Sequence, residues 1–389
     1  MPFQGVDYYG IDELFSEEER IVRDTVRKFV GNRIVPIIEE CFNQAKFPKQ
    51  LIPELSELGC IGPTIPEEYG GGGSSYSIYG LMMQELERGD SGIRSFCSVM
   101  SSLVMYPIFT FGSEEHRKNF LPKLAKGKMI GCFGLTEPNY GSNPAGLVTS
   151  AKNDGDFWVL NGSKTWITNA GMADVAVIWA RTDEGIRGFV VEADTKGFEQ
   201  REIKNKFSLR ASVTGEIFLE DCRIPAKNLL PGTSRGLGAA LMCLTQARYG
   251  IAWGGIGCAM AVYDATLKYA KERIQFDKPI AGFQLVQSKL VGMLNEITKA
   301  QLLCWRLGRM MDSGKAKYNH VSLAKMNNVR MALDAARLGR DIHGAYGITT
   351  EYPIIRHMLN MESVNTYEGT EDVNRLIVGR DITGLEAFK

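Results

Sequence analysis

The spacing of hydrophobic residues changes twice along the chain, and this limits the possible folds more than any other feature. Up to about residue 130, apolar residues recur at intervals of three and four, which predicts helices. From Gly131, turn signals such as Asn161-Gly162 arrive every ~8–12 residues between short apolar runs, which indicates β-strands. Long helical patterns return from Leu237.

The length supports a division into several packed units. At 389 residues the chain exceeds the roughly 250–300 residues at which a single core usually divides. We therefore predict an α+β fold with an N-terminal α-helical domain (1–130), a middle β-sandwich or barrel (131–235) and a C-terminal four-helix bundle (236–389). Residues 250–270, 283–311 and 318–343 are each long enough for one arm of that bundle, and the last helix completes it.

Several residues mark the expected helix ends. Ser16 and Glu19 form a capping box at the start of the first helix, and Pro36 is predicted to end it. The hydroxyl of Thr370 is predicted to cap the last helix, and Gly379 to end it in a left-handed conformation. The loop before Thr370 therefore leads directly into a helix N-terminus.

Composition excludes some partners. The chain has 45 Lys and Arg residues and 45 Asp and Glu residues, so nothing in its net charge favours nucleic acid or an anionic membrane. The eight cysteines include no CxxC pair and the four histidines show no ligand spacing, so we expect reduced thiols and no metal site. No uninterrupted apolar run is long enough for a bilayer, and the N-terminus lacks signal-peptide features. We expect a bacterial cytoplasmic protein, or a mitochondrial matrix protein if the chain is a processed eukaryotic one.

The loop at 365–370 carries Glu368 next to Gly369. Glycine has no side chain and lets a ligand approach closely, so a carboxylate beside it is suited to taking a proton from a bound small molecule. The local sequence leaves a second interpretation open, in which Glu368 is a solvated loop residue without a chemical role.

Two further stretches are suited to contacting a flat heterocycle. Residues 131–142 are rich in Gly, Thr and Ser, whose backbone amides and hydroxyls can approach the edge of a ring. Trp166 and Thr168 could place an indole against such a ring and a hydroxyl at its polar edge, although a strand tryptophan is also typical of a core. The glycine-rich loop at 70–73 is not a dinucleotide fingerprint, because no strand with a G-x-G-x-x-G pattern precedes it.

Taken together, these blocks resemble the acyl-CoA dehydrogenase family, and within it the glutaryl-CoA dehydrogenases. The resemblance covers essentially the whole chain, including the α–β–α order, and implies an FAD enzyme without a Rossmann fingerprint. Five separated blocks carry it: Pro66-Glu67-Glu68-Tyr69-Gly70-Gly71, residues 133–142, Trp166-Ile167-Thr168, Arg273-Ile274-Gln275-Phe276 and Tyr367-Glu368-Gly369-Thr370.

The resemblance implies that Glu368 is the catalytic base, which removes a proton α to the thioester carbonyl while hydride leaves the β-carbon for FAD. In other branches of the family the base precedes an arginine of the first bundle helix, but here Ala247 precedes Arg248. FAD contacts are implied for Phe133, Leu135, Thr136, Ser142, Trp166, Ile167, Thr168 and Thr370. Contacts to the FAD of a neighbouring subunit are implied for Arg273, Phe276, Gln284, Asp341, His343, Gly344 and Ala345.

For the substrate, the resemblance implies that Arg94 faces the distal carboxylate of a glutaryl group. A guanidinium suits this role because it stays charged and offers a planar fork of donors. Tyr367 before the base is typical of members that decarboxylate, with protonated Glu368 returning its proton and Glu87 as a polar neighbour in that step. The other implied substrate contacts are Ser95, Ser98, Ser142, Leu244, Arg248, Tyr249 and Gly369.

The implied reaction is conversion of glutaryl-CoA into crotonyl-CoA and carbon dioxide, with electrons passed to an electron-transfer flavoprotein. A homo-oligomer, expected to be a tetramer, is implied by the shared FAD site. Three alternatives stay open: a short-chain acyl-CoA dehydrogenase for a neutral acyl group, a glutaryl-CoA dehydrogenase that does not decarboxylate, and a family-like flavoprotein that binds nucleic acid. The chain departs from the family pattern at Asn143, at 343–346, and at Glu371 and Asn374, where two histidines are usual.

Overall fold

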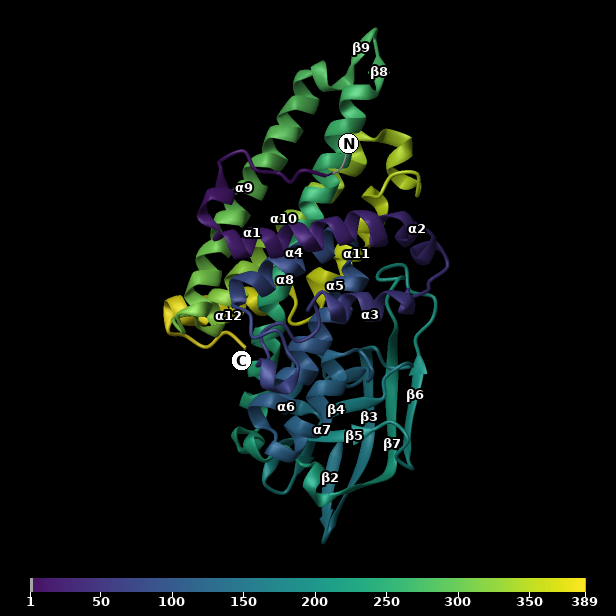
Figure 1. The fold of residues 1–389 in the computed structure, drawn as a ribbon, viewed down its shortest axis with the longest axis vertical. Coiled ribbons are helices and arrows are strands. Elements are labelled where there is room, and N and C mark those ends of the chain that lie inside the picture. The colour runs from purple at the N-terminus through teal and green to yellow at the C-terminus, as the bar shows by residue number, and fades with distance from the viewer. Residues whose placement is uncertain (1–2, 389) are drawn as a thin grey trace.

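The computed structural model describes residues 3–388 (Figure 1). In this view the long C-terminal helices form the upper part with a short hairpin at its tip, the first N-terminal helices cross the middle, and the main sheet lies at the lower end beside α6 and α7. The helices before the sheet are α1 (Glu17–Phe29), α2 (Val35–Asn43), α3 (Ile52–Glu57), α4 (Tyr76–Gly89), α5 (Ser91–Ser98), α6 (Tyr106–Phe111) and α7 (Glu114–Ala125). The predicted order of helical, β and helical parts is confirmed.

The first helices begin as the sequence indicates but do not end there. The Ser16 hydroxyl accepts a hydrogen bond from Glu19 N at 3.2 Å, and the Glu19 carboxylate accepts one from Ser16 N at 2.8 Å. The prediction that Pro36 ends this helix is wrong. A π-helical segment, Val30–Ile34, joins α1 to α2, and Pro36 lies in the first turn of α2, a position that tolerates proline.

The middle part is a seven-stranded mixed sheet. Its strands are β1 (Gly131–Gly134), β2 (Ser150–Asp154), β3 (Phe157–Thr168), β4 (Val175–Thr182), β5 (Gly185–Glu192), β6 (Phe198–Glu202) and β7 (Thr214–Pro225). They follow the order β1-β4-β2-β3-β7-β6, and β5 pairs with β4. Alternate residues of β4 belong to two cores: Val177 packs with the helices, whereas Ile178 packs inside the β part.

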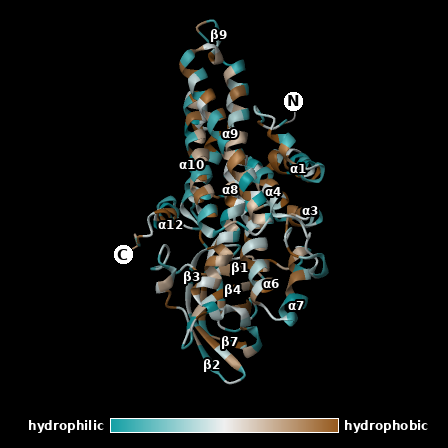
Figure 2. Ribbon diagram, turned by 90° about the vertical axis from the view of Figure 1, so that its left-hand side faces the viewer, coloured by the Kyte–Doolittle hydropathy of each residue, from teal (hydrophilic) through white to brown (hydrophobic). Residues whose placement is uncertain are grey.

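The C-terminal part is dominated by three long helices. It contains α8 (Leu237–Glu272), α9 (Gln284–Asp312), α10 (Tyr318–Ile342), α11 (Ile354–Thr366) and α12 (Glu371–Thr383). A short hairpin, β8 (Ile274–Gln275) with β9 (Lys278–Pro279), joins α8 to α9 at the tip of the molecule (Figure 2). Hydrophobic and hydrophilic residues alternate along these helices in the same view, as amphipathic packing requires. The prediction for Gly379 is wrong, because it lies inside α12 and Gly384, with φ of 70°, ends the helix.

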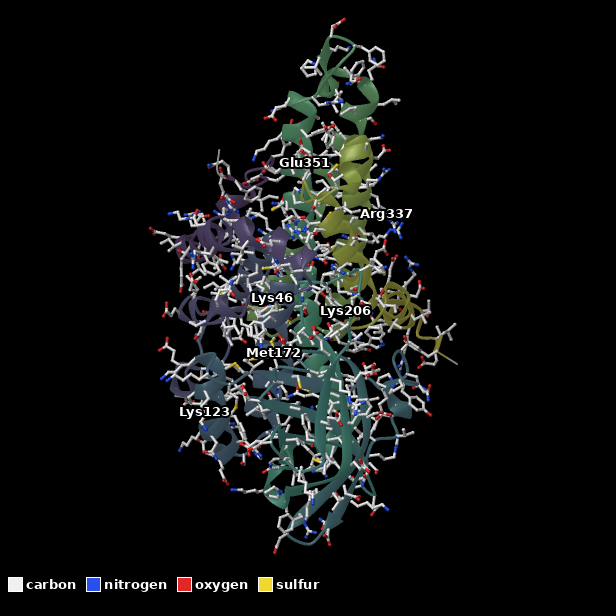
Figure 3. The ribbon with its side chains drawn as sticks, turned by 90° about the vertical axis from the view of Figure 1, so that its right-hand side faces the viewer. Lys46, Lys123, Met172, Lys206, Arg337 and Glu351 are labelled. Carbon is white, nitrogen blue, oxygen red and sulfur yellow. The ribbon has the colours of Figure 1, made fainter. Side chains whose placement is uncertain are left out.

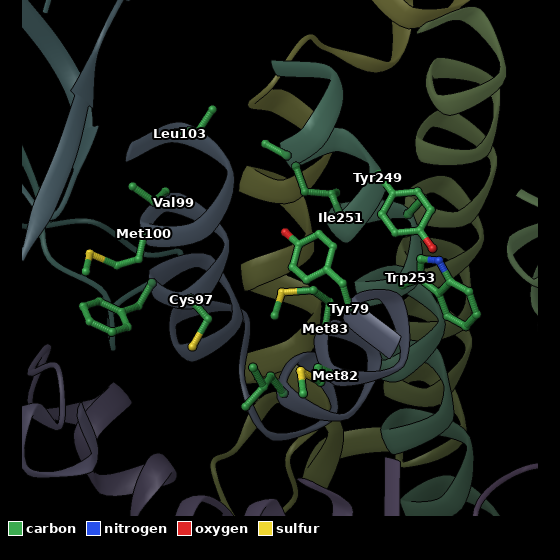
Figure 4. Packing of buried hydrophobic residues seen from close by; sticks show 14 of the residues in the cluster. Tyr79, Met82, Met83, Cys97, Val99, Met100, Leu103, Tyr249, Ile251 and Trp253 are labelled. Atoms are coloured by element: carbon green, nitrogen blue, oxygen red, sulfur yellow. The ribbon is translucent and has the colours of Figure 1, made fainter. Parts of the chain in front are cut away.

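Glycines of α8 let two other helices approach it closely. A Cβ at Gly257 would lie 1.8 Å from the carbonyl oxygen of Gln84 in α4, and one at Gly255 would lie 2.7 Å from that of Asn328 in α10. Tyr79 and Met83 of α4 pack against α8 in the same core (Figure 4). The first and last parts of the chain therefore share one hydrophobic core.

One continuous helical stretch among the described residues, Ser91–Phe111, is long and apolar enough to cross a membrane by length and composition. However, 89% of its most apolar window is buried inside the protein. Its π-helical segment, Val99–Met105, packs against β1 and the other helices, so this stretch is a core element.

Candidate active site

A cavity of about 700 Å³ lies between the sheet and the helices. Its wall comes from α5, the ends of β1 and β3, the loop at 203–209, α8, and the loop between α11 and α12. Lys206, one of the lining residues, lies where the strands meet the helices (Figure 3). A cavity of this size is typical of small-molecule and cofactor sites.

Glu368 faces this cavity from a backbone conformation that residues other than glycine rarely adopt. Its φ is 56° and that of Gly369 is 90°, so two successive residues turn the chain in the left-handed region. A Cβ at Gly369 would lie 3.0 Å from Nη2 of Arg248. The hydroxyl of Thr370 then accepts a hydrogen bond from Val373 N at 3.1 Å and caps α12. The sequence thus folds into a tight turn with Glu368 at its tip.

The carboxyl group of Glu368 is suited to accepting a proton. Its Oε2 is buried and makes no hydrogen bond with the residues that the structure describes. Burial raises the pKa of Glu368 to about 7, although the positive charges of Arg248, Lys325 and Arg94 oppose the rise. Since an unperturbed glutamate has a pKa of about 4.3, this environment makes a stronger base that still ionises near neutral pH.

Arg94 lines the cavity near Glu368 and is held by the buried Glu87 and the half-buried Tyr367. Its Nε donates a hydrogen bond to Glu87, and its Nη2 donates one to the hydroxyl of Tyr367. Gly254 of α8 leaves room for this group, because a Cβ there would lie 2.7 Å from Oε2 of Glu87. Burial alone would lower the pKa of Arg94, but the charge of Glu87 and the hydrogen bonds to Glu87 and Tyr367 raise it overall. The cavity therefore contains a fixed cation near the Glu368 carboxyl group.

The sheet side of the cavity combines apolar faces with hydroxyl groups. Trp166 lies at an irregularity of β3, where the register with β7 shifts between Lys164 and Ile167. Its φ is 59° and 63% of the residue is exposed, so the indole lines the cavity instead of the core. Phe133 and Leu135 are nearly buried beside the hydroxyl of Thr136. This wall matches a flat ring with polar edges.

A buried ion pair supports the loop after β1. The Nζ of Lys164 donates to Glu137 Oε1 at 2.8 Å and to the Leu135 carbonyl at 3.2 Å. The Glu137 carboxylate also accepts hydrogen bonds from the backbone amides of Val148 at 2.7 Å and Thr149 at 2.9 Å. The pair thus fixes the two ends of the segment that contributes Thr136 and Ser142 to the cavity.

Most of the residues singled out in the sequence line this cavity together. They are Arg94, Ser95, Ser98, Phe133, Leu135, Thr136, Ser142, Trp166, Ile167, Thr168, Leu244, Tyr367, Glu368, Gly369 and Thr370. Glu87 lies behind Arg94, and Arg248 contacts the turn itself, since its Nε donates to the Glu368 carbonyl at 2.6 Å. Ala247, the alternative base position, also lines the cavity and has no titratable group.

Tyr249 requires a correction, because it is not on the cavity wall. It is fully buried, and its hydroxyl donates to the Tyr76 carbonyl at 2.7 Å. Its ring lies with that of Trp253, away from Val99 and Leu103, which do line the cavity (Figure 4). One residue along α8 from Arg248 corresponds to a rotation of about 100°, which directs Tyr249 into the core against α4.

A second predicted set lies outside the cavity of this chain. Arg273, Phe276 and Gln284 are at or beside the β8–β9 hairpin, where Phe276 is 88% exposed. Asp341 pairs with Lys289, and Gly344 and Ala345 follow α10 in a short 3₁₀ helix. His343 is buried, with its ring stacked 4.3 Å from that of Tyr269, so its imidazole is not available at the surface. The contact of this set with a neighbour's cofactor stays a prediction.

Three groups at the site were missed in the sequence. They are the Glu137–Lys164 pair, the cavity loop at 203–209, and Lys325 of α10, whose Nζ lies under the Glu368 turn. The sequence does contain an indication for Lys325: it lies on the same apolar helix face as Val321, Ala324 and Val329, and a lysine buried on such a face is expected to have hydrogen-bond partners. The 203–209 loop carries no comparable pattern.

Comparison with known proteins identifies the class to which this fold and site belong. Three family models match successive parts of the chain: the N-terminal domain of acyl-CoA dehydrogenases at 16–128, the middle domain at 132–222, and the C-terminal domain at 234–383. The chain belongs to the acyl-CoA dehydrogenase family and is an oxidoreductase of that class. The resemblance seen in the sequence is confirmed.

Within the family, the chain is similar to glutaryl-CoA dehydrogenases. It is 52% identical to a solved glutaryl-CoA dehydrogenase of Mycobacterium smegmatis, with a TM-score of 0.96 and 98% of each chain covered. A second structure from that organism, a glutaryl-CoA dehydrogenase in complex with FADH2, is 47% identical, with a TM-score of 0.97 and 99% of each chain covered. The mitochondrial short-chain specific acyl-CoA dehydrogenase of Rattus norvegicus is 34% identical over 367 residues, 93% of this chain and 89% of the relative.

Proposed function

We propose that this acyl-CoA dehydrogenase oxidises glutaryl-CoA and decarboxylates the product to crotonyl-CoA. The observation that carries the proposal is the pair of groups in one cavity: the Glu368 carboxyl and the fixed guanidinium of Arg94. A base alone suits any acyl-CoA, whereas a buried cation beside it suits an acyl chain that ends in a carboxylate. The 52% identity to a glutaryl-CoA dehydrogenase supports the same substrate.

FAD is the cofactor, as the family assignment and the relative in complex with FADH2 indicate. The residues present fit it: the exposed indole of Trp166 and the apolar side chains of Phe133 and Leu135 suit the faces of a flat ring. Hydroxyls of Thr136 and Thr168 suit the polar edge of that ring. When bound, FAD would accept the hydride that leaves the substrate β-carbon.

Glu368 would remove the proton on the α-carbon of the thioester. Its pKa of about 7 narrows the difference between its pKa and that of the substrate α-carbon. After the transfer Glu368 is a neutral carboxylic acid. It then holds the proton that a second step requires.

Arg94 would hold the distal carboxylate, because its guanidinium keeps its charge when buried. In the second step the bond between that carboxylate and the carbon chain breaks, carbon dioxide leaves, and the electron pair stays on the carbon chain. Protonated Glu368 returns its proton to that anion, which gives crotonyl-CoA. Tyr367 supports this step, since its hydroxyl contacts Nη2 of Arg94 next to the base.

The substrate assignment is tested by Arg94→Met, measured with glutaryl-CoA and butyryl-CoA. We expect kcat/KM for glutaryl-CoA to fall about 10²- to 10³-fold, because the substrate carboxylate loses a charged partner in a desolvated site. The value for butyryl-CoA should fall less than about tenfold. The double variant Arg94→Met, Glu87→Gln is the matched control. In Arg94→Met the Glu87 carboxylate loses its partner, and the second substitution removes that unpaired charge.

A short-chain dehydrogenase for a neutral acyl group is the competing function, which the similarity to the rat short-chain enzyme favours. A wild-type preference for butyryl-CoA, or unchanged glutaryl-CoA turnover in Arg94→Met, would establish that alternative instead.

Decarboxylation is tested by the products of anaerobic turnover with a chemical electron acceptor. We expect wild-type enzyme to release carbon dioxide and crotonyl-CoA in equal amounts. Tyr367→Val should oxidise glutaryl-CoA and accumulate glutaconyl-CoA, because Arg94 loses the hydroxyl that fixes its position. Accumulation of glutaconyl-CoA by the wild-type enzyme would refute the second step.

We also propose that electrons pass to an electron-transfer flavoprotein and that the active enzyme is a homotetramer. The exposed Phe276 and the neighbouring Leu285, which is 79% exposed, support contact with another copy of the chain. Sedimentation velocity and stopped-flow reduction of the partner flavoprotein measure the two properties, and a monomer that binds FAD fully would contradict a shared site.

A further inference from the structure

Lys325 is a buried cation whose hydrogen-bond partners lie in the turn that carries Glu368 and in the last turn of α11 before it. It lies on α10 and is inaccessible to solvent. Its Nζ donates to the carbonyl oxygens of Gly369 at 2.8 Å, Tyr367 at 3.1 Å and Asn365 at 3.4 Å. These three acceptors match the three N–H groups of an ammonium, whereas a neutral amine has only two.

Two other side chains complete this set of contacts. The Nε of Arg248 donates to the Glu368 carbonyl at 2.6 Å, and the side-chain amide of Asn374 donates to the carbonyls of Gly369 at 2.8 Å and Thr370 at 3.0 Å. Each carbonyl from 367 to 370 therefore accepts a hydrogen bond from a side chain of α8, α10 or α12. A residue other than glycine keeps a φ of 56° only when surrounding contacts hold its backbone in place, and these hydrogen bonds do so for Glu368.

The charge of Lys325 acts on Glu368 in addition to the hydrogen bonds that Lys325 donates to the turn. Glu368, Arg248, Arg94 and Glu371 are the charged groups that act on Lys325. Of these, Glu368 is the anion in the cavity, and the Lys325 charge favours its carboxylate form, as do Arg248 and Arg94. Burial and the charge of Arg248 lower the pKa of Lys325 to about 7, and the charges of Glu368 and Glu371 oppose this fall.

We propose that Lys325 is a positioning residue for the catalytic base: its ammonium holds the strained turn at 367–370 so that the Glu368 carboxylate points into the cavity. This inference rests on the assignment of Glu368 as the base, but not on the identity of the acyl group. Because Lys325 donates only to backbone carbonyls, it acts on the reaction through Glu368.

The test compares Lys325→Met and Lys325→Arg with wild-type enzyme, using the acyl-CoA that the wild type turns over fastest. Methionine keeps the length and packing of lysine but has neither charge nor donors. We expect kcat of Lys325→Met to fall about 10- to 100-fold with KM changed less than about threefold. The exposed Lys118→Met is the matched control and should behave as wild type.

The pH profile separates positioning from a general loss of structure. The wild-type kcat should rise with pH through about 7, because the carboxylate is the active form of Glu368, and should fall again at higher pH as Lys325, whose pKa is also about 7, loses its proton. Loss of the Lys325 cation disfavours that carboxylate, so the inflection of Lys325→Met should move to higher pH, whereas Lys325→Arg should keep the wild-type inflection.

Hydrogen exchange of the enzyme without substrate gives a second readout that needs no turnover. Exchange should become faster in Lys325→Met only in the segment around 365–371. Unchanged exchange in that segment together with a wild-type kcat and inflection would overturn the proposal, even if glutaryl-CoA proves to be the wrong substrate. If Lys325→Met is insoluble, Lys325→Gln, which keeps an amide donor without charge, takes its place in the same measurements.

Discussion

Replacing Glu368 with glutamine is expected to reduce the rate of flavin reduction by about 10²- to 10⁴-fold, the range typical of a lost general base. The substitution keeps the shape of the side chain and the strained turn, but the amide cannot accept a proton at neutral pH. Acyl-CoA binding should be nearly unchanged, since Arg94 and the cavity wall remain. Anaerobic stopped-flow bleaching of the flavin absorbance measures the rate, and a titration with substrate measures the affinity.

Asp372→Asn is the matched control for this experiment. It makes the same carboxylate-to-amide change four residues away, on a side chain that is 84% exposed, and should reduce flavin at the wild-type rate. A Glu368→Gln enzyme that reduces flavin within tenfold of wild type would mean that another group removes the proton.

Replacing Gly257 with alanine is expected to be among the most destabilising single-methyl additions in this protein. The new Cβ would lie 1.8 Å from the Gln84 carbonyl oxygen and 3.0 Å from Arg88 N, so the backbones of α4 and α8 must separate. Overpacking typically costs about 1–3 kcal/mol, and here we expect at least the upper end, because backbone atoms cannot rotate away. The thermal unfolding midpoint and the yield of soluble, flavin-containing protein report the loss.

Gly292→Ala tests whether this effect comes from the contact and not from changing a helical glycine. Gly292 lies on α9, and a Cβ there would have no other atom within 4 Å, so alanine should leave stability unchanged or raise it by up to about 1 kcal/mol through helix propensity. Equal midpoints for the two alanine variants would show that α4 and α8 are less closely packed than these distances indicate.

The overall fold was accessible from the sequence because each part has its own periodicity. Hydrophobic spacing separates helices from strands, and the Ser16 capping box and the Thr370 cap form with the predicted partners. Helix ends that depend on the neighbouring structure were harder to predict from the sequence. Pro36 is compatible with stopping a helix or starting one, and only the π-helical segment before it determines which occurs.

For the site, the local sequence marked Glu368 beside Gly369 as a candidate proton acceptor, and only the family resemblance implied that it is the base. The site was inaccessible where partners lie far apart in sequence. Lys325 is 44 residues from Gly369, and Lys164 is 27 residues from Glu137, so no local pattern pairs them. The sequence does not decide whether the Trp166 ring packs in the core or lines the cavity, since alternation along a strand does not reveal the irregularity in β3 that exposes this ring.

The close contact of α4 with α8 has a consequence for how the chain acquires its structure. The helix that supplies Glu87 is synthesised early, but the glycine-bearing surface that it packs against, at Gly254 and Gly257, follows about 170 residues later. Contacts so distant in sequence close a long loop and form slowly. Because the helical parts at the two ends of the chain share one core, we expect them to unfold together, and the Glu87–Arg94 pair is covered by Gly254 only once that core has formed.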